Sequence, residues 1–183
     1  MIFSADRGDF FARRRDVLMH FNEATSINFL VKAVRFLWAL FASLAVVILY
    51  AFPAALAVET GEWYSSLLLP RFALAEGGYT AVTALVYAAD VAALSSLVYG
   101  GERGIGFCLP VATGFFNVFL CYVFFRLRSL TAAAVVAGIA LACTVACAAV
   151  NIRKNAFAAT VFCVKTLWNA YLFALAIAVA AAN

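Results

Sequence analysis

The sequence predicts an all-α integral membrane protein, a bundle of five transmembrane helices. Of its 183 residues, 67% are hydrophobic and only 12% are charged, and the mean hydropathy is +1.02. Soluble domains are only about half apolar, so this composition excludes them. Several apolar runs exceed the ~18 residues that separate a membrane span from a buried core helix. The runs are continuously apolar, whereas barrel strands alternate in segments of about 10 residues, so helices are expected throughout.

Residues 1–32 are expected to form a cytoplasmic basic segment ahead of the membrane domain, which covers 33–183. A signal peptide is not expected, because the first apolar run starts late and is too long for the apolar region of such a peptide. The stretch DFFARRRDVLMHFNEA has an amphipathic pattern. It could lie on the membrane surface as a short helix, or it could be a solvated tail that only fixes orientation.

The membrane domain divides into five predicted spans. Their boundaries are about 33–57, 79–99, 105–125, 130–150 and 156–182. Short loops follow the second, third and fourth spans, so consecutive helices are expected to be antiparallel neighbours in one bundle. Lys and Arg gather in the N-terminal segment, near Arg103, and at Arg153 and Lys154, which the positive-inside rule places on the cytoplasmic side. The N-terminus is then cytoplasmic, and the loop after the first span faces outward.

The loop at 58–78, between the first and second spans, is several times longer than the loops between the later spans. It contains GEWYSSLLLPRF, with an aromatic pair at Trp63 and Tyr64 and a proline at Pro70. Long ordered loops on small bundles are usually functional covers or binding elements. Pro70 would stiffen the return into the second span. A flexible outer turn is the alternative.

Two ionisable residues lie deep within the predicted spans. At 1.5 Å per residue, Asp90 is about 17 Å below the outer end of the second span, and Lys165 is about 14 Å above the inner end of the fifth. The two residues should therefore lie at similar depth, and they can pair if their helices are adjacent. Pairing would relieve the cost of charges in the membrane. Such a pair would either fix helix register or form the polar floor of a ligand cavity.

Asn117 and Trp168 are further candidates inside the spans. The amide of Asn117 should form a hydrogen bond with a neighbouring helix or with a ligand. Trp168 lies near the middle of its span instead of at the interfacial belts where tryptophan is common. Its indole would offer a flat apolar ligand a stacking surface and one N–H donor. Packing alone explains such residues equally well.

The sequence shows no constellation of catalytic or metal-binding residues. The five cysteines fall inside predicted spans, and the single histidine, His20, lies outside the bundle. Ser-His-Asp arrangements, phosphate-binding glycine loops and nucleic-acid-binding patches are all missing. We therefore expect no catalytic residues, no metal site, no required cofactor and no nucleic-acid partner.

Aromatic and amide residues, together with one leucine and one proline, recur at defined spacings from the loop to the fifth span. They are Trp63, Tyr64, Leu67 and Pro70 in the loop, Tyr79 and Tyr87 in the second span, Asn117, Phe124 and Phe125 in the third, and Trp168 and Asn183 in the fifth. In this order and spacing they resemble the translocator protein family, also called tryptophan-rich sensory proteins (TspO/MBR). The resemblance covers about 35–183.

The chain departs from the family at several positions. Thr83 and Leu120 stand where the family has tryptophans. Val164 and Lys165 replace a Pro-Tyr pair, and the Pro-Pro after the loop is missing. The resemblance is therefore to a divergent member, in which Asp90 and Lys165 could mark a different ligand preference.

The resemblance implies a cavity that opens toward the first loop and binds porphyrins such as haem or protoporphyrin, or, in animal members, cholesterol. The protein would then be a receptor- or transporter-like binder of a flat apolar ligand, with Trp63 and Tyr64 in a lid and Trp168 in a wall. The candidate ligand-binding residues are Trp63, Tyr64, Pro70, Tyr87, Asp90, Asn117, Phe124, Lys165 and Trp168.

A different class of function is a membrane scaffold without a small ligand. Ala134, Gly138 and Ala142 recur one turn apart in the fourth span and could pack against a second copy or a partner subunit. A binding protein needs an enclosed pocket lined by Trp168 and Asn117, whereas a scaffold would fill that space with side chains. Oxidative breakdown of a bound porphyrin is a third, less favoured function.

Overall fold

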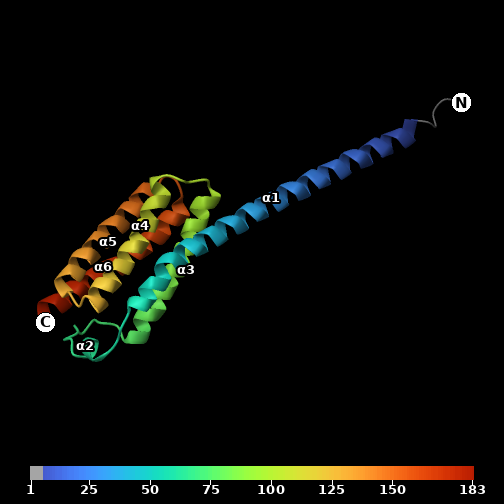
Figure 1. The fold of residues 1–183 in the computed structure, drawn as a ribbon. Helices are drawn as coiled ribbons and strands as arrows, with labels where there is room; N and C mark the ends of the chain where they lie inside the picture. Colours follow the sequence, from blue (N-terminus) through green and yellow to red (C-terminus); the bar gives the residue numbers. More distant parts are fainter. Residues whose placement is uncertain (1–5) are drawn as a thin grey trace. The chain divides into compact units, whose positions relative to one another are not determined.

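The computed structural model describes the backbone of residues 6–183 and the side chains of residues 27–75 and 77–183. Across these residues the fold is all-α, without strands (Figure 1). The elements are α1 (Asp6–Ala57), α2 (Glu62–Ser65), α3 (Glu76–Tyr99), α4 (Ile105–Cys121), the π-helix η1 (Tyr122–Arg126), α5 (Leu130–Asn151) and α6 (Ala156–Ala182).

The predicted five spans are confirmed. Five segments within the described helices are long and apolar enough to cross a membrane: Ile27–Ala57, Gly77–Tyr99, Ile105–Arg126, Leu130–Asn151 and Ala156–Ala182. The helix that contains the first span, α1, begins at Asp6, well before the predicted span boundary at 33. The backbone of DFFARRRDVLMHFNEA belongs to α1, but the side chains of this amphipathic stretch lie outside the described residues.

The chain divides into two compact units, 1–38 and 39–183. In the second unit α5 packs along both α4 and α6, and α3 packs along α6 and reaches α4. The connections from α3 onward are short turns, as expected for antiparallel neighbours. Asn155 caps the N-terminus of α6, where its side chain accepts a hydrogen bond from the N–H of Ala158 at 3.0 Å.

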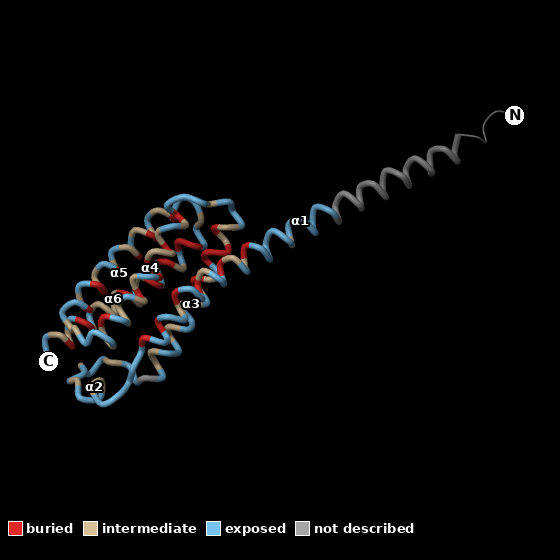
Figure 2. Tube along the Cα trace, viewed as in Figure 1, coloured by how far each residue is buried: buried red, intermediate tan, exposed pale blue. Residues whose placement is uncertain are grey.

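The core of the second unit is built from the inward faces of its helices (Figure 2). Its largest apolar members are Tyr50 from α1, Leu94 and Leu97 from α3, and Phe162 from α6. Apolar side chains on the other faces are exposed, as expected for helices that face lipid instead of water. The polar residues among the buried ones are therefore exceptions that call for a physical reason.

Candidate functional site

The loop after α1 is an ordered structure. Its middle forms the single turn α2, where the Ser65 hydroxyl donates to the Glu62 carbonyl at 2.9 Å and the Ser66 hydroxyl donates to the Trp63 carbonyl at 2.7 Å. Toward α3, the N–H of Ala73 donates to the Pro70 carbonyl at 2.9 Å. The loop therefore has a local structure that its own hydrogen bonds hold.

One end of the loop rests on a first aromatic cluster, which consists of Trp63, Tyr64, Phe124 and Phe125. The ring of Trp63 meets Phe124 edge to face at 5.6 Å between centroids, and Tyr64 lies 5.8 Å from Phe125. The Arg128 guanidinium lies over the Trp63 ring at 5.5 Å. The predicted aromatic pair is thus seated on the π-helix that ends the third span.

The other end of the loop rests on a second aromatic cluster, which consists of Phe72, Tyr79, Trp168 and Tyr171. Trp168 stacks on Tyr171 at 5.3 Å, and its ring lies 6.4 Å from that of Tyr79. The two tyrosine hydroxyls share a hydrogen bond of 3.0 Å, and the N–H of Leu74 donates to each at 3.1 Å. Trp168 therefore lies beneath the loop, but away from Trp63 and among different partners.

Further polar contacts fasten the loop between these clusters. The N–H of Leu68 donates to Asn183 Oδ1 at 2.9 Å, and Asn183 Nδ2 donates to the Leu68 carbonyl at 3.3 Å. Arg126 donates to the Glu59 carboxylate at 3.1 Å and to the Leu56 carbonyl at 2.9 Å. The loop is consequently tied to η1 and to the end of α6.

A hollow of about 250 Å³ lies beside the first aromatic cluster. Its walls are Glu59, Gly61, Glu62, Trp63, Phe125 and Arg128. Arg128 has a φ of 53°, in the left-handed region that non-glycine residues seldom adopt, and it follows the π-helix closely. Both backbone features are concentrated at functional sites in proteins. The hollow brings an aromatic wall, carboxylates and a guanidinium together beside the first aromatic cluster.

A second hollow of about 390 Å³ is an apolar groove on α4, lined by Ala112, Phe115, Phe116 and Phe119. Neither hollow is lined by Trp168 or Asn117. The enclosed pocket expected between those two residues therefore stays a prediction.

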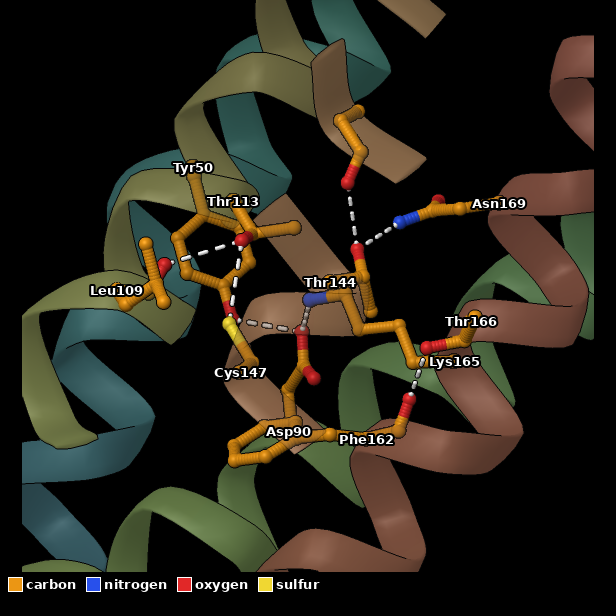
Figure 3. A network of polar contacts seen from close by, with 11 residues as sticks. Tyr50, Asp90, Leu109, Thr113, Thr144, Cys147, Phe162, Lys165, Thr166 and Asn169 are labelled. Carbon is orange, nitrogen blue, oxygen red and sulfur yellow. Dashed lines mark hydrogen bonds and ion pairs between the residues drawn. The ribbon is translucent and has the colours of Figure 1, made fainter. Parts of the chain in front are cut away.

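The predicted pairing of Asp90 and Lys165 is confirmed (Figure 3). Lys165 Nζ donates to Asp90 Oδ2 at 2.5 Å, and each side chain is only 2% exposed. A third partner is Tyr50, whose hydroxyl donates to the same carboxylate oxygen at 3.0 Å. Sequence reasoning missed Tyr50, because a tyrosine near the end of a span is also typical of the interfacial belt.

More polar side chains surround the charged pair (Figure 3). One turn beyond Lys165 on α6, Asn169 donates to the hydroxyl of Thr144 on α5 at 2.5 Å. The Thr113 hydroxyl on α4 and the Cys147 thiol on α5 are in contact at 3.5 Å. The ion pair is therefore part of a network that joins α1, α3 and α6, with a second group of contacts between α4, α5 and α6.

Five buried side-chain oxygens in the described residues have no hydrogen-bond partner. They are Ser43 Oγ, Asp90 Oδ1, Asn117 Oδ1, Asn151 Oδ1 and Asn169 Oδ1. The carbonyl oxygen of Asn117 thus makes no bond to a neighbouring helix, and it is left available to another partner.

The structure divides the predicted binding residues among three places. Trp63, Tyr64 and Phe124 form the first aromatic cluster, whereas Trp168 belongs to the second. Asp90 and Lys165 lie in the core. Tyr87 packs edge-on against Tyr50 in the core at 5.6 Å, Asn117 is buried in α4, and Pro70 is half-buried in the loop.

No protein-family model matches this chain, and a search of curated proteins finds no match either. The resemblance to the translocator protein family rests on the sequence pattern alone. Within the residues that the structure describes, no three His, Cys, Asp or Glu side chains are grouped so as to hold a metal ion.

Proposed function

We propose that this protein binds a flat apolar ligand of the porphyrin or sterol class at the loop-covered end of its helical bundle. The observation that carries the proposal is the way the loop is held. Each end rests on aromatic side chains of the spans, around Trp63 on one side and Trp168 on the other. Binding sites for flat apolar ligands commonly consist of aromatic rings with a few polar groups at their edges.

The size of the hollow indicates how a ligand would bind. Its volume is about 250 Å³, below the roughly 300–1,000 Å³ of common small-molecule sites. A porphyrin would therefore have to displace part of the loop. The contacts that hold the loop are hydrogen bonds and ring contacts of about 1 kcal/mol each, so partial opening has a modest cost. Arg128 would then be placed to pair with a carboxylate on the edge of the ligand.

The proposal agrees with the resemblance to the translocator protein family, whose members bind porphyrins or cholesterol. In this account the protein is a receptor or a transporter, and no catalytic step is assigned to it. The loop residues Trp63 and Tyr64 would form the moving cover, and Trp168 would contribute to the wall that stays with the bundle.

The alternative of a scaffold has less support. A Cβ added to Gly138 would lie 3.1 Å from the Phe173 ring on α6. Part of the small-residue stripe on α5 is therefore already used inside the chain. A homodimer through another face stays a prediction.

Titration of the purified full chain with protoporphyrin IX, followed by the absorbance of the porphyrin, tests the proposed function. We expect saturable binding that weakens in Trp63→Phe and in Trp168→Phe. Trp38→Phe is the matched control, because the Trp38 side chain is 71% exposed and belongs to the other compact unit. Absence of saturable binding, or equal binding by all variants, would rule out the proposed site.

A further inference from the structure

We propose that the network around Asp90 and Lys165 is a hydrated proton-transfer site within the membrane, separate from the ligand site under the loop. Three titratable side chains from three helices meet there at one oxygen, Asp90 Oδ2, which accepts from both Lys165 and Tyr50. Ionisable residues at this depth are uncommon and usually functional. A pair that only fixed helix register would be expected to satisfy both carboxylate oxygens.

The second carboxylate oxygen of Asp90, Oδ1, is buried and has no hydrogen-bond partner in the protein. Each of the other four spans also has one buried side-chain oxygen without a partner, on Ser43, Asn117, Asn151 and Asn169. All of these atoms can accept hydrogen bonds. Buried polar groups left unpaired by protein are normally satisfied by internal water, which can donate two hydrogen bonds. We therefore place water beside Asp90 and along this series of oxygens.

The unpaired oxygens are spread along the bundle on both sides of the ion pair. Asn151 is the final residue of α5, at the end opposite the loop. With a rise of 1.5 Å per residue, Asn117 lies about 14 Å from the loop-side end of its span at Arg126. By the same rise Asp90 is about 20 Å below the loop-side end of α3. Water bound to Asn117 would lie on the loop side of the ion pair, and water bound to Asn151 would lie on the opposite side.

Among the residues whose side chains the structure describes, Lys165 is the ion-pair partner of Asp90. The remaining titratable groups near it are Tyr87 on its own helix and Cys147 on α5, whereas α4 contributes the neutral Thr113. The pair is neutral as a whole. Moving one proton between its members leaves two neutral groups, which avoids an isolated buried charge.

The transfer balances without any reactant other than water. The Lys165 ammonium gives a proton to the Asp90 carboxylate, which yields an amine and a carboxylic acid. The acid then releases its proton to water on one side, and the amine takes up a proton from water on the other side. The ion pair is restored, and one proton has crossed the site. Only N–H and O–H bonds change.

The experiment uses the full chain in phospholipid vesicles that enclose a pH-sensitive dye, with the membrane potential clamped by potassium and valinomycin. After an external pH step, we expect proton flux above that of protein-free vesicles. Asp90→Asn and Lys165→Met should each reduce the flux to the protein-free level. In each variant the residue left behind can become neutral, so folding is not prevented by an unpaired charge.

Ser95→Ala is the matched control. Ser95 is also a buried polar residue of α3, but its hydroxyl donates to the Val91 carbonyl of its own helix at 2.6 Å. This variant should keep the parental flux. If either charge-removing variant fails to fold, Asp90→Glu retains the charge with a displaced carboxylate and should conduct more slowly than the parent. Parental flux no greater than that of protein-free vesicles would overturn the proposal, and so would parental flux in Asp90→Asn.

Discussion

The ring of Tyr50 lies against the backbone of α4 at Gly114, so closely that a Cβ on Gly114 would be 2.6 Å from the ring. This contact seats α1 on the bundle and places the Tyr50 hydroxyl on Asp90. Glycine is therefore needed at position 114 for the close approach of two helices.

Gly114→Ala should destabilise the protein by about 1–3 kcal/mol, the usual cost of overpacking a core. Gly77→Ala is the control, because a Cβ there would meet nothing within 4 Å. The free energy of unfolding in detergent micelles, from denaturant titration, measures both. Equal stability of the two variants would show that the Tyr50 ring can move aside.

Removing one member of the buried ion pair should be costly. Asp90→Leu or Lys165→Met alone is expected to lower the free energy of unfolding by about 3–5 kcal/mol, because the remaining buried group loses its partner and must either stay charged or give up its charge, at a cost in both cases. The double variant replaces both charges by apolar side chains and should recover most of that loss, apart from the cost of leaving the buried Tyr50 hydroxyl without its acceptor. The same titration measures all three variants. Additive losses in the double variant would contradict direct pairing.

Asn183→Ala should loosen the loop without unfolding the bundle. It removes both hydrogen bonds to Leu68, and one such bond is commonly worth about 0.5–1.5 kcal/mol. The rate of hydrogen exchange at the Leu68 amide should therefore increase about tenfold. The Ala73 amide, which donates within the loop to Pro70, is the internal control. Unchanged exchange at Leu68 would mean that Asn183 does not hold the loop.

The predicted orientation can be checked with introduced cysteines. Ser66 is exposed in the loop, and Arg153 is exposed in the turn between α5 and α6. In a chain whose five natural cysteines are replaced by alanine, a membrane-impermeant maleimide applied to intact cells should label Ser66→Cys and leave Arg153→Cys unlabelled. The reverse labelling pattern would place the loop in the cytoplasm and the N-terminus outside.

The spans and the ion pair could be predicted because their signals are local in sequence. Long apolar runs have few alternatives to membrane helices, and Asp90 and Lys165 stand out in such runs at matching depths. The separation of Trp63 from Trp168 depends on which helix end each part of the loop meets, and spacing along the chain carries no such information. The contact of Gly138 with Phe173 was likewise decided by packing, since small residues serve internal and external helix contacts equally well.

Binding of a flat apolar ligand under the loop can be measured with three chains that each keep one natural tryptophan. Protoporphyrin IX should quench the chain that retains only Trp63 and the chain that retains only Trp168, with the same saturation point. The chain that retains only Trp38, whose side chain is 71% exposed, should show weak quenching without saturation, as partition into the micelle would produce. Equal quenching of all three chains, or no quenching of the first two, would show that the ligand does not bind under the loop.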